Sequence, residues 1–516
     1  MKSDIIYNKN KMFLPIFSAI LGILAFFPFN FSYIFGFVFL APLFIFIFQE
    51  KKFWRLILGI FIFKIILSTV TLYFAFEPYG FLLSIFVFLG LAIAVFLIKR
   101  LLSRFAKPSI VNSQWSIVLL LPFLWIFFEN LQAGYSFLPV YLGTVGNIFG
   151  NSPFLGLAAV AGLNTLSFFA VLINILIALA IFNFKKLSYK SNFAVIVIVI
   201  IIVAAGWQIS QIKLQQNSNF YGNRPNALKV GLISNNEKFD EEFLIFKSDI
   251  FTDEEKELAS LMIDEKLNLL RADLRDKKLD LLILPEDMID IEVWNDADKE
   301  AQEKFGISNA GILIKAYRNL AKELNTYLVA TLTTIQDNKR YNSTLLFNSE
   351  GELVDIYSKS HLTIGGEYWP FDNWRPFYYD WLKKIMPKLD TENAIFNPAY
   401  QYTPGNKKLL KNENLSFASL ICIEVHYPYE VKAFKNLGAQ FISHTSSNRW
   451  IAIGLKNYLY LTDNLRKIEA VWLRIPILIN GRYEKAGIIT PAGKINVIDF
   501  ESPSKNYGLF TGEIKY

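Results

Sequence analysis

Residues 279–286 read Leu-Asp-Leu-Leu-Ile-Leu-Pro-Glu, a short apolar run that ends on a proline and an acid. Such a run predicts a buried β-strand over Leu279 to Leu284, and Pro285-Glu286 marks the end of this strand. Before it, Glu254 to Lys277 has the acidic and basic faces of an exposed helix, and Ala227 to Ile233 forms another β-rich run. This order of strand, helix and strand predicts an α/β layer domain.

The same alternation continues to about residue 505. Helices are predicted over 309–324, 430–437 and 455–472, and strands over 327–334, 341–348, 353–359, 416–422, 441–444 and 476–480. Turn residues predict two hairpins, one at Ser349-Glu350-Gly351 and one around Pro491-Ala-Gly493. We assign residues 226–505 to this domain and 506–516 to a carboxy-terminal tail. Active groups in such sheets are expected at the strand ends.

The first 210 residues consist of long apolar runs with short breaks. About seven runs lie at 12–29, 33–48, 56–76, 80–98, 114–128, 155–182 and 192–209. The chain is 53% apolar, with a mean hydropathy of +0.32, which is too high for an ordinary soluble protein. Because a membrane-spanning helix needs roughly 20 apolar residues, residues 1–210 are predicted to form a multi-pass α-helical membrane domain of about seven spans.

Positive charges mark alternate breaks between these runs. Lys and Arg gather before the first run and after the second, fourth and sixth, whereas Asn30 to Ser32, Glu77 to Tyr79 and Glu129 to Pro153 contain none. The positive-inside rule then predicts a cytoplasmic amino terminus and places everything from about residue 210 onward outside the cytoplasm. The first run is predicted to be a retained span, because no clear signal-peptide cleavage site follows it.

Two ions interrupt the apolar half. Lys64 lies within the third run, and Glu129 ends the fifth in the segment Trp125-Ile-Phe-Phe-Glu129. An ion inside a membrane is costly and often functional. For Lys64 the alternative is that its side chain extends to the cytoplasmic face.

Charge and cysteine content exclude several classes of protein. The residues before 210 hold 14 Lys and Arg against 4 Asp and Glu, and the remainder holds 38 against 41. The overall charge of +7 therefore sits beside apolar runs, where it would meet lipid headgroups, and does not indicate nucleic-acid binding. One Cys and three His exclude a disulfide framework and Cys-rich metal sites, and we expect no metal or organic cofactor.

Glu286, Lys359 and Cys422 are polar residues that each end a predicted buried strand. A thiol that attacks an acyl carbon needs a base, and the resulting oxyanion needs a positive or hydrogen-bonding partner. Taken singly, each residue has a structural alternative: a small buried hydrophobe for Cys422, an acid near a helix start for Glu286 and a solvated cation for Lys359. Their joint occurrence favours a catalytic interpretation.

These local patterns resemble the nitrilase family, whose members use a Glu-Lys-Cys triad. The matching pieces are Leu284-Pro285-Glu286, Tyr357-Ser-Lys359-Ser-His361-Leu and Cys422-Ile-Glu424. With the apolar half, the chain resembles the apolipoprotein N-acyltransferase family. Weaker matches there are Phe27-Pro28-Phe29, Ala41-Pro42-Leu43, Trp125 with Glu129, and the stretch from Leu138-Pro139 to Leu142-Gly143. The resemblance implies a nitrilase-like αββα domain on the outer side of a bacterial inner membrane.

The resemblance also implies the chemistry. Cys422 would carry the acyl group as a thioester, Glu286 would act as general base and Lys359 would stabilise the oxyanion. Glu367 and Glu424 match supporting acids that orient the lysine and the thiol. The implied reaction moves a fatty acyl chain from a membrane phospholipid to the amino-terminal diacylglyceryl-cysteine of an apolipoprotein. The implied partners are this lipid, this acceptor and the membrane, with no nucleic acid.

Three features depart from the family pattern. Ile423 stands where an aromatic residue usually follows the nucleophile, and no eighth span fits after Ile498. The stretch 443–450 reads Ser-His-Thr-Ser-Ser-Asn-Arg-Trp, where members more commonly carry an Asn-Asp pair before the Trp. These departures concern substrate positioning more than acyl transfer.

An aromatic stretch from Tyr368 to Trp381 is expected to give lipid access to the nucleophile. Its aromatic density is typical of a segment at headgroup level, and Trp369, Phe371 and Trp374 are the candidate contacts. The alternative is a loop packed on the core of its own domain.

Two other functions remain open at this stage. A membrane-tethered amidohydrolase would use the same triad but pass the thioester to water. A non-catalytic transporter or binding protein would use Lys64 and Glu129 as its functional ions.

Overall fold

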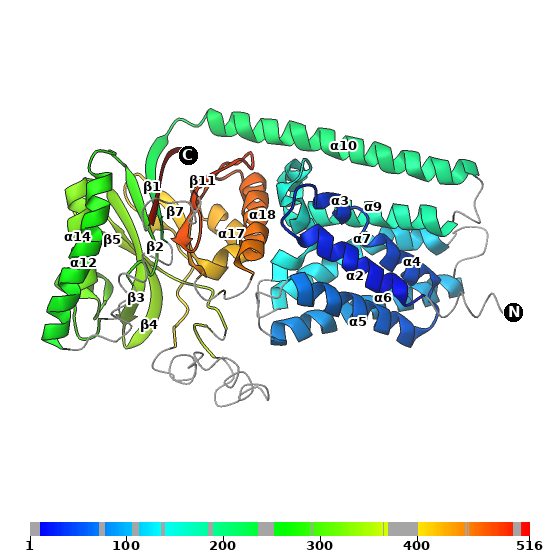
Figure 1. Ribbon diagram of the computed structural model, residues 1–516, viewed down its shortest axis with the longest axis horizontal. Coiled ribbons are helices and arrows are strands. Elements are labelled where there is room, and N and C mark those ends of the chain that lie inside the picture. The colour runs from blue at the N-terminus through cyan, green and yellow to red at the C-terminus, as the bar shows by residue number, and fades with distance from the viewer. Residues whose placement is uncertain are drawn as a thin grey trace. The chain divides into compact units, whose positions relative to one another are not determined.

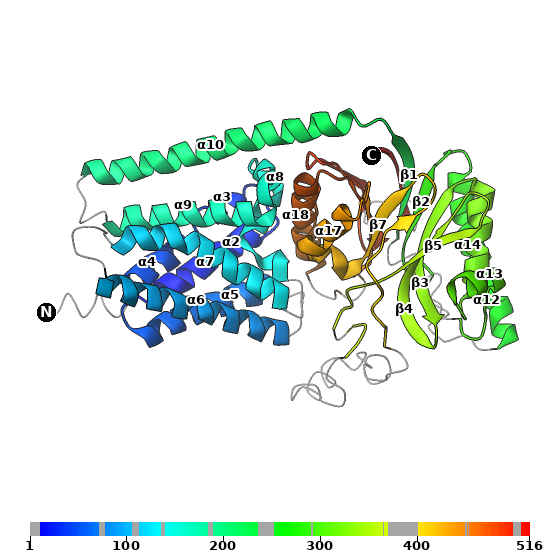
Figure 2. The ribbon, with the colours of Figure 1, turned by 180° about the vertical axis from the view of Figure 1, so that it is seen from behind.

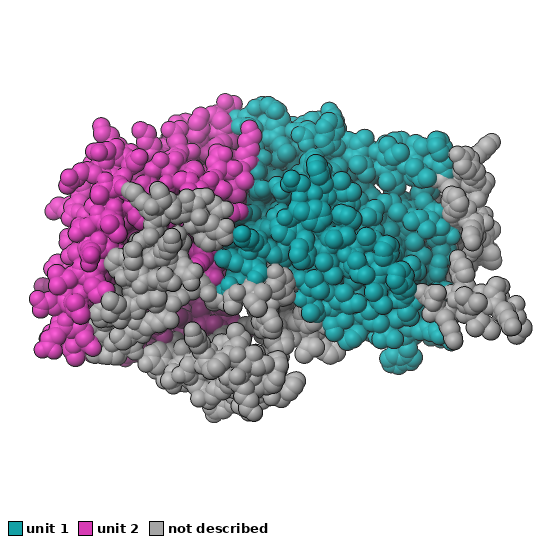
Figure 3. Space-filling model, viewed as in Figure 1, with its two compact units in different colours: residues 1–220, 451–474, 491–493 teal, residues 221–450, 475–490, 494–516 magenta. Residues whose placement is uncertain are grey.

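The computed structural model describes residues 11–516 except for 72–77, 106–112, 136–139, 184–188, 236–251, 290–292, 365, 370–400, 449–450, 452–453 and 499–506. The chain divides into two compact units (Figure 3). Unit 1 comprises residues 1–220, 451–474 and 491–493, and unit 2 comprises 221–450, 475–490 and 494–516. The segment 451–474 and the turn 491–493, which the sequence assigned to the α/β domain, thus pack with the helical unit.

Unit 1 is made of helices that, apart from α18, fall largely within the apolar runs. They are α2 (Phe13–Phe26), α3 (Tyr33–Gly36), α4 (Ala41–Gln49), α5 (Phe53–Thr71), α6 (Pro78–Phe105), α7 (Ser113–Tyr135), α8 (Ala158–Ala161), α9 (Leu163–Asn183), α10 (Tyr189–Gly222) and α18 (Leu455–Leu473). Short 3₁₀ segments lie between α7 and α8, namely η1 (Val140–Gly143), η2 (Val145–Asn151) and η3 (Leu155–Leu157).

Three helices of the described part are long and apolar enough to cross a membrane, judged by length and composition. They are Phe53–Thr71, Leu163–Phe182 and Phe193–Gly222. Helix α2 has 14 residues, and at about 1.5 Å per residue such a helix falls short of the roughly 30 Å of a hydrocarbon core. Seven crossings are therefore not confirmed and stay a prediction.

The second predicted run forms two helices rather than one, because a side chain from α9 satisfies the break. Asn174 Oδ1 accepts hydrogen bonds from the backbone N–H groups of Leu40 (2.8 Å) and Ala41 (3.1 Å) at the start of α4. Its Nδ2 donates to the carbonyl oxygens of Gly36 (2.8 Å) and Ala170 (2.9 Å). A helix start leaves N–H groups unpaired, and burying them unpaired is costly, so Asn174 makes the break stable.

Lys64 and Glu129 are both buried inside unit 1. The Lys64 side chain is 5% exposed, and its Nζ lies 4.1 Å from the centroid of the Phe88 ring. It therefore points into the protein rather than toward solvent. The Glu129 carboxylate accepts hydrogen bonds from Trp125 Nε1 (2.9 Å), Val145 N (2.8 Å) and Ser167 Oγ (2.7 Å). These contacts join α7, η2 and α9.

Helix α10 lies along α9 in both ribbon views (Figure 1, Figure 2). Gly206 permits this approach, because a Cβ at that position would come within 2.4 Å of the Phe169 ring. Along its length α10 exposes large apolar side chains, including Ile200 (61%) and Ile201 (60%). Exposed apolar surface of this extent is typical of an interaction with another apolar phase.

The described residues of unit 2 form a twelve-stranded sheet in the order β5-β4-β3-β2-β1-β9-β8-β7-β6, with β10, β11 and β12 off this path. The strands are β1 (Ala227–Asn235), β2 (Leu281–Glu286), β3 (Tyr327–Gln336), β4 (Lys339–Phe347), β5 (Leu353–Ser358), β6 (Leu410–Lys411), β7 (Ser416–Ile421), β8 (Ile442–Ser447), β9 (Ile477–Arg482), β10 (Ala486–Ile489), β11 (Ile495–Ile498) and β12 (Tyr507–Lys515). This arrangement confirms the predicted α/β domain.

The sheet folds over on itself, so that strands far apart in its order touch. Ser419 Oγ of β7 donates a hydrogen bond to Thr344 Oγ1 of β4 at 3.1 Å. Asn480 Nδ2 of β9 also donates to the carbonyl oxygen of Ile283 in β2, the next strand but one (3.3 Å). Strands β1, β2 and β3 run parallel, as do β9, β8 and β7. Parallel pairing brings the carboxyl ends of β2, β7 and β8 to one region of the domain.

Helices α12 (Asp253–Leu274) and α14 (Gly311–Leu324) cover one face of this sheet (Figure 1). Helix α12 begins with a capping box, in which Thr252 Oγ1 accepts from the N–H of Glu255 while the Glu255 carboxylate accepts from the N–H of Thr252. Buried apolar residues of both helices pack on β2 and form the core of the unit, with Leu267, Leu270, Ile314, Leu282 and Leu284 among its members.

The carboxy-terminal residues, set apart as a tail from the sequence, contain strand β12. It pairs antiparallel with β1 over the full length of both strands, from Ala227 opposite Lys515 to Asn235 opposite Tyr507. The Tyr507 hydroxyl also bonds to the Asp273 carboxylate of α12. The pairing satisfies the backbone of β1 on that side, which is what ties this segment to the sheet.

Candidate active site

Glu286 is the last residue of β2 and lies in the interior of unit 2. Its side chain is 5% exposed. Oε1 accepts a hydrogen bond from Asn342 Nδ2 (2.9 Å), and Oε2 accepts one from the backbone N–H of Ser447 at the end of β8 (2.7 Å). The strand end predicted from residues 279–286 therefore carries a carboxylate that two other strands hold in place.

Lys359 follows β5 directly and is 1% exposed. Its Nζ donates to Glu367 Oε2 at 2.7 Å, and its backbone N–H donates to the carbonyl oxygen of Asn342 at 2.8 Å. Glu367 Oε2 also accepts from the backbone N–H of Thr363 at 2.7 Å. A buried ammonium needs such a partner, because removing it from water is costly.

Asn342, on β4, joins the two carboxylates and was not predicted from the sequence. Its Nδ2 donates to Glu286 Oε1 at 2.9 Å and to Glu367 Oε1 at 3.1 Å. Asparagine is depleted in strands, so an Asn inside the predicted strand 341–348 was the one available signal. That signal says nothing about its partners, which are 56 and 25 residues away along the chain.

Cys422 comes immediately after β7 and begins the short 3₁₀ segment η5 (Cys422–His426). Its φ is +53°, a left-handed conformation that non-glycine residues seldom adopt, and its side chain is 8% exposed. Its carbonyl oxygen accepts a hydrogen bond of 2.8 Å from His444 Nε2 on β8. A residue held in an uncommon backbone conformation by surrounding contacts is frequent at active sites.

Glu424 connects the Cys422 turn to the loop that carries Lys359. Its Oε2 accepts from the backbone N–H of Ile421 at 2.9 Å. Its Oε1 accepts from Tyr357 Oη (2.6 Å), Ser360 N (2.8 Å), Ser360 Oγ (2.9 Å) and His361 N (3.1 Å). Glu424 is 1% exposed, and these bonds are compatible with the orienting role expected of it.

The pKa shifts separate the roles that these groups can take. Burial raises the pKa of the Cys422 thiol to about 12, and the Glu286 carboxylate raises it too, so the thiol is protonated at neutral pH. Burial also raises the pKa of Glu286, against the opposing effect of Lys359, which favours its accepting a proton. For Lys359, burial lowers the pKa, but the neighbouring Glu367 and Glu286 carboxylates outweigh burial and raise it, so the ammonium form is retained.

The pKa of Glu367 moves in the other direction. Burial raises it, but the Lys359 ammonium and the hydrogen bonds from Lys359, Thr363 and Asn342 outweigh burial and lower it. Glu367 is thus ionised more readily than a free carboxyl, and its carboxylate pairs with Lys359. The site contains a protonated thiol, an acceptor carboxyl and a fixed cation, which is the set needed for thiol-dependent acyl chemistry.

Of the three residues expected to contact lipid, Trp369 lies within the described residues and is 9% exposed, and its expected contact with lipid stays a prediction. Phe371 and Trp374 lie outside the described residues. Ile423, which replaces the usual aromatic residue, is 5% exposed.

The stretch 443–450, which departs from the family pattern, is described up to residue 448. Ser447 contributes its backbone N–H to Glu286, so this contact does not depend on its side chain.

Comparison with known proteins finds a matching protein family for each of the two parts of the chain. Residues 256–470 match the carbon-nitrogen hydrolase family, and residues 18–176 match the apolipoprotein N-acyltransferase N-terminal domain. Unit 2 is thus a domain of the carbon-nitrogen hydrolase class. Both matches fall on one chain, which is therefore similar to apolipoprotein N-acyltransferases over residues 18–176 and to carbon-nitrogen hydrolases over residues 256–470.

Individual relatives are proteins named apolipoprotein N-acyltransferase. The apolipoprotein N-acyltransferase of Aquifex aeolicus is 26% identical over 249 residues, which is 48% of this chain and 48% of that protein. Apolipoprotein N-acyltransferase 2 of Treponema denticola is 24% identical over 209 residues, 40% of this chain and 38% of that protein. The chain therefore spans under half the length of these curated relatives.

Among solved structures, Nit3 of Saccharomyces cerevisiae, a member of the nitrilase superfamily, is similar to this chain. It has 16% sequence identity and a TM-score of 0.37, covering 57% of this chain and 91% of its own.

Proposed function

We propose that the protein is an N-acyltransferase that moves a fatty acyl chain from a membrane phospholipid, through a thioester on Cys422, to the amino-terminal diacylglyceryl-cysteine of an apolipoprotein. One observation carries the proposal: the buried Lys359 ammonium is held 2.7 Å from Glu367 and acts electrostatically on both Glu286 and Cys422. A cation fixed beside a buried thiol and a carboxyl that can take its proton suits an acyl-enzyme reaction.

In the first half-reaction the Glu286 carboxylate takes the proton of the Cys422 thiol, and the sulfur attacks the ester carbonyl carbon of the phospholipid. The carbonyl oxygen becomes an oxyanion that faces the Lys359 ammonium. When the C–O bond breaks, the lysophospholipid oxygen takes the proton from Glu286 and leaves. The acyl group stays on Cys422 as a thioester.

In the second half-reaction the acceptor amine attacks the thioester carbonyl carbon. Glu286 accepts a proton from the amine nitrogen as the C–N bond forms, and Lys359 again faces the oxyanion. The C–S bond then breaks, and the proton held by Glu286 returns to the sulfur. Glu424 and Glu367 transfer no proton in this scheme, since their hydrogen bonds hold the Cys422 turn and the Lys359 ammonium.

The membrane placement belongs to the same proposal. We place residues 1–210 in the bacterial inner membrane with about seven crossings and a cytoplasmic amino terminus, and the catalytic domain, residues 226–505, on the outer side. Three helices of sufficient length and the exposed apolar side chains of α10 support the membrane, and the distribution of Lys and Arg supports the orientation.

Intact-protein mass spectrometry tests the reaction. The purified chain is incubated with phospholipid, then with a synthetic diacylated lipopeptide, beside Cys422→Ser. We expect a fatty-acyl mass increase that disappears on adding lipopeptide, as a triacylated peptide forms, and no thioester adduct on Cys422→Ser. Absence of any adduct on the folded wild-type chain would overturn the proposal.

A second candidate is a membrane-tethered amidohydrolase, which the match of residues 256–470 to the carbon-nitrogen hydrolase family favours. It uses the same three residues and passes the acyl group to water. The same experiment separates the two, because a hydrolase releases free fatty acid at a rate that the lipopeptide does not change.

A further inference from the structure

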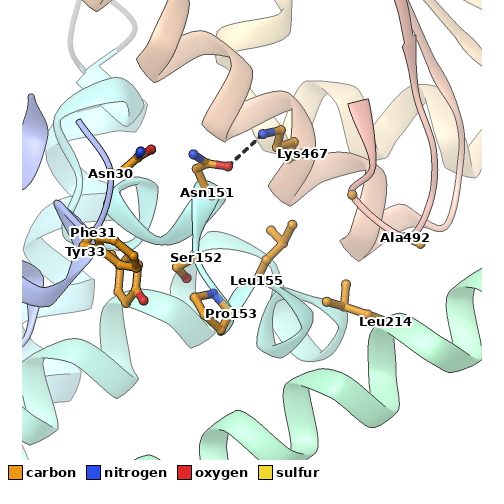
Figure 4. Close-up of a pocket in the computed structure, with 12 residues that line it drawn as sticks. Asn30, Phe31, Tyr33, Asn151, Ser152, Pro153, Leu155, Leu214, Lys467 and Ala492 are labelled. Carbon is orange, nitrogen blue, oxygen red and sulfur yellow. Dashed lines mark hydrogen bonds between the residues drawn. The ribbon is translucent and has the colours of Figure 1, made fainter. Parts of the chain in front are cut away.

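Unit 1 contains a pocket of about 400 Å³ that none of the proposed catalytic residues lines. Figure 4 shows its wall, which is assembled from segments far apart in the sequence. Asn30 and Phe31 come from the turn after α2, Asn151 and Ser152 from the end of η2, Leu214 from α10 and Lys467 from α18. A volume of this size is within the range of small-molecule sites in proteins.

The lining segments share one predicted side of the membrane. Asn30 to Ser32 and Glu129 to Pro153 are two of the breaks that contain no Lys or Arg, and the positive-inside rule places both outside the cytoplasm. Leu214 lies in the last part of α10, beyond the predicted seventh run. The pocket is therefore at the outer ends of the apolar helices, where lipid headgroups lie.

The polar part of the wall favours an anion. Lys467 is the one charged residue among the twelve that line the pocket, which include no Asp or Glu. Its Nζ donates to Asn151 Oδ1 at 3.1 Å, as the dashed line in Figure 4 marks. An ammonium with neighbouring amide groups from Asn30 and Asn151 can donate several hydrogen bonds to phosphate oxygens.

The other part of the wall is apolar and exposed. Phe31 is 65% exposed and has a φ of +67°, which is uncommon for a residue other than glycine. Phe29 (41%) and Ile34 (52%), on either side of it in the chain, are exposed as well. A polar wall with one cation beside an exposed apolar rim suits a ligand that has a phosphate and adjoining hydrocarbon, rather than a free ion.

We propose that this pocket binds the phosphate of a phospholipid headgroup in the outer leaflet. Lys467 and Asn151 contact the phosphate oxygens, and Phe31 contacts the start of the hydrocarbon. The site goes beyond the proposed acyl transfer, because Glu286, Lys359 and Cys422 are not among the described residues that line it.

Native mass spectrometry of the full chain in detergent micelles tests this proposal. The chain carries Cys422→Ser, so that bound lipid is not consumed and the result does not depend on acyl transfer. The probes are dioleoyl-phosphatidylglycerol, dioleoylglycerol and inorganic phosphate. We expect Lys467→Met to retain one phosphatidylglycerol fewer than its parent, with affinity for that lipid about tenfold weaker, and Lys467→Arg to retain it.

Two variants serve as controls. Lys456→Met removes an exposed lysine of the same helix that does not line the pocket, and it should leave lipid retention unchanged. Ala492→Phe fills the pocket without removing its cation and should lose the same lipid, which keeps the test valid if Lys467→Met fails to fold.

Three results would overturn the proposal. They are unchanged phosphatidylglycerol retention in both Lys467→Met and Ala492→Phe, equal retention of dioleoylglycerol at this site, or full displacement of the lipid by an equimolar amount of inorganic phosphate. The last result would assign the pocket to free phosphate.

Discussion

Each unit of the protein buries a glutamate at nearly the same exposure, 6% for Glu129 in unit 1 and 5% for Glu286 in unit 2, yet their surroundings differ. Glu129 accepts three hydrogen bonds from neutral donors that belong to three elements, and it lies within the electrostatic reach of Lys64. Glu286 accepts two hydrogen bonds and lies within the electrostatic reach of Lys359, Glu367 and Cys422. The first carboxylate joins helices, whereas the second shares its surroundings with a cation, another carboxylate and a thiol, so a proton can pass between groups there.

The two buried lysines repeat this contrast. Lys64 lies over the Phe88 ring at 4.1 Å, whereas Lys359 is paired with Glu367 at 2.7 Å in a cluster that includes the thiol. Buried charge alone therefore does not distinguish structure from chemistry in this chain. The distinction lies in whether the neighbouring groups can exchange protons or stabilise a developing charge.

The largest expected effect is that of Cys422→Ala. Removing the proposed nucleophile should lower acyl transfer by about 10³-fold or more, since no other thiol exists in the chain. Transfer to a diacylated lipopeptide, followed by mass spectrometry, measures the loss, and a thermal unfolding scan checks that the fold persists. Transfer at the wild-type rate would contradict a thioester on Cys422. Glu286 would then have no thiol to deprotonate, and the chemical difference between it and Glu129 would disappear.

Next in size is the paired change of the two lysines. Lys359→Met should slow acylation by about 10²- to 10³-fold, because the oxyanion loses its cation. Lys64→Met should leave the rate per folded molecule almost unchanged, because Phe88 is a packing partner and not a reacting group. Single-turnover acylation measures the rate of both variants. Equal losses would show that Lys359 and Lys64 do not differ in their effect on the reaction.

The substitution Asn342→Leu tests the contrast between Glu286 and Glu129 through the pH dependence of the rate. Asn342 donates to Glu286 and so lowers its pKa against the effect of burial; without that donor the pKa of Glu286 rises further. The reaction needs the Glu286 carboxylate, so the acidic limb of the pH–rate profile should move to higher pH and the rate at neutral pH should fall by about tenfold. The matched control is Asn174→Leu in unit 1, whose pH profile should keep its acidic limb. An unshifted acidic limb in Asn342→Leu would show that Asn342 has no influence on the pKa of Glu286 during the reaction.

The smallest effect on the rate is expected from Glu129→Gln. A Gln keeps the size of the side chain but replaces one acceptor oxygen with an NH₂ group, so at least one of the bonds from Trp125, Val145 and Ser167 is lost. We expect a loss of about 1–3 kcal/mol in stability, with little change in the rate per folded molecule. Thermal unfolding in detergent measures the first and single-turnover acylation the second. A fall in rate without a fall in stability would give Glu129 a part in the chemistry.

Much of the fold follows from local patterns in the chain. The period of apolar residues predicted β2, β7 and α12 close to their observed bounds, and the polar residues at the ends of the strands pointed to Glu286, Lys359 and Cys422. The role of Asn342 could not be predicted in this way, because it depends on two carboxylates from separate elements. The break between α3 and α4 depends likewise on Asn174, which is 134 residues from Leu40.

By itself, the sequence determined the division into an apolar helical part and an α/β part, the order of strands and helices, and the polar groups at the strand ends. These features are local, because side-chain period and turn residues act over a few positions. Only the tertiary structure decided which buried charges become partners, that residues 451–474 pack with unit 1, and that β12 joins β1. Such contacts join residues far apart in the chain, so they are set by packing and by the need to pair each buried polar group.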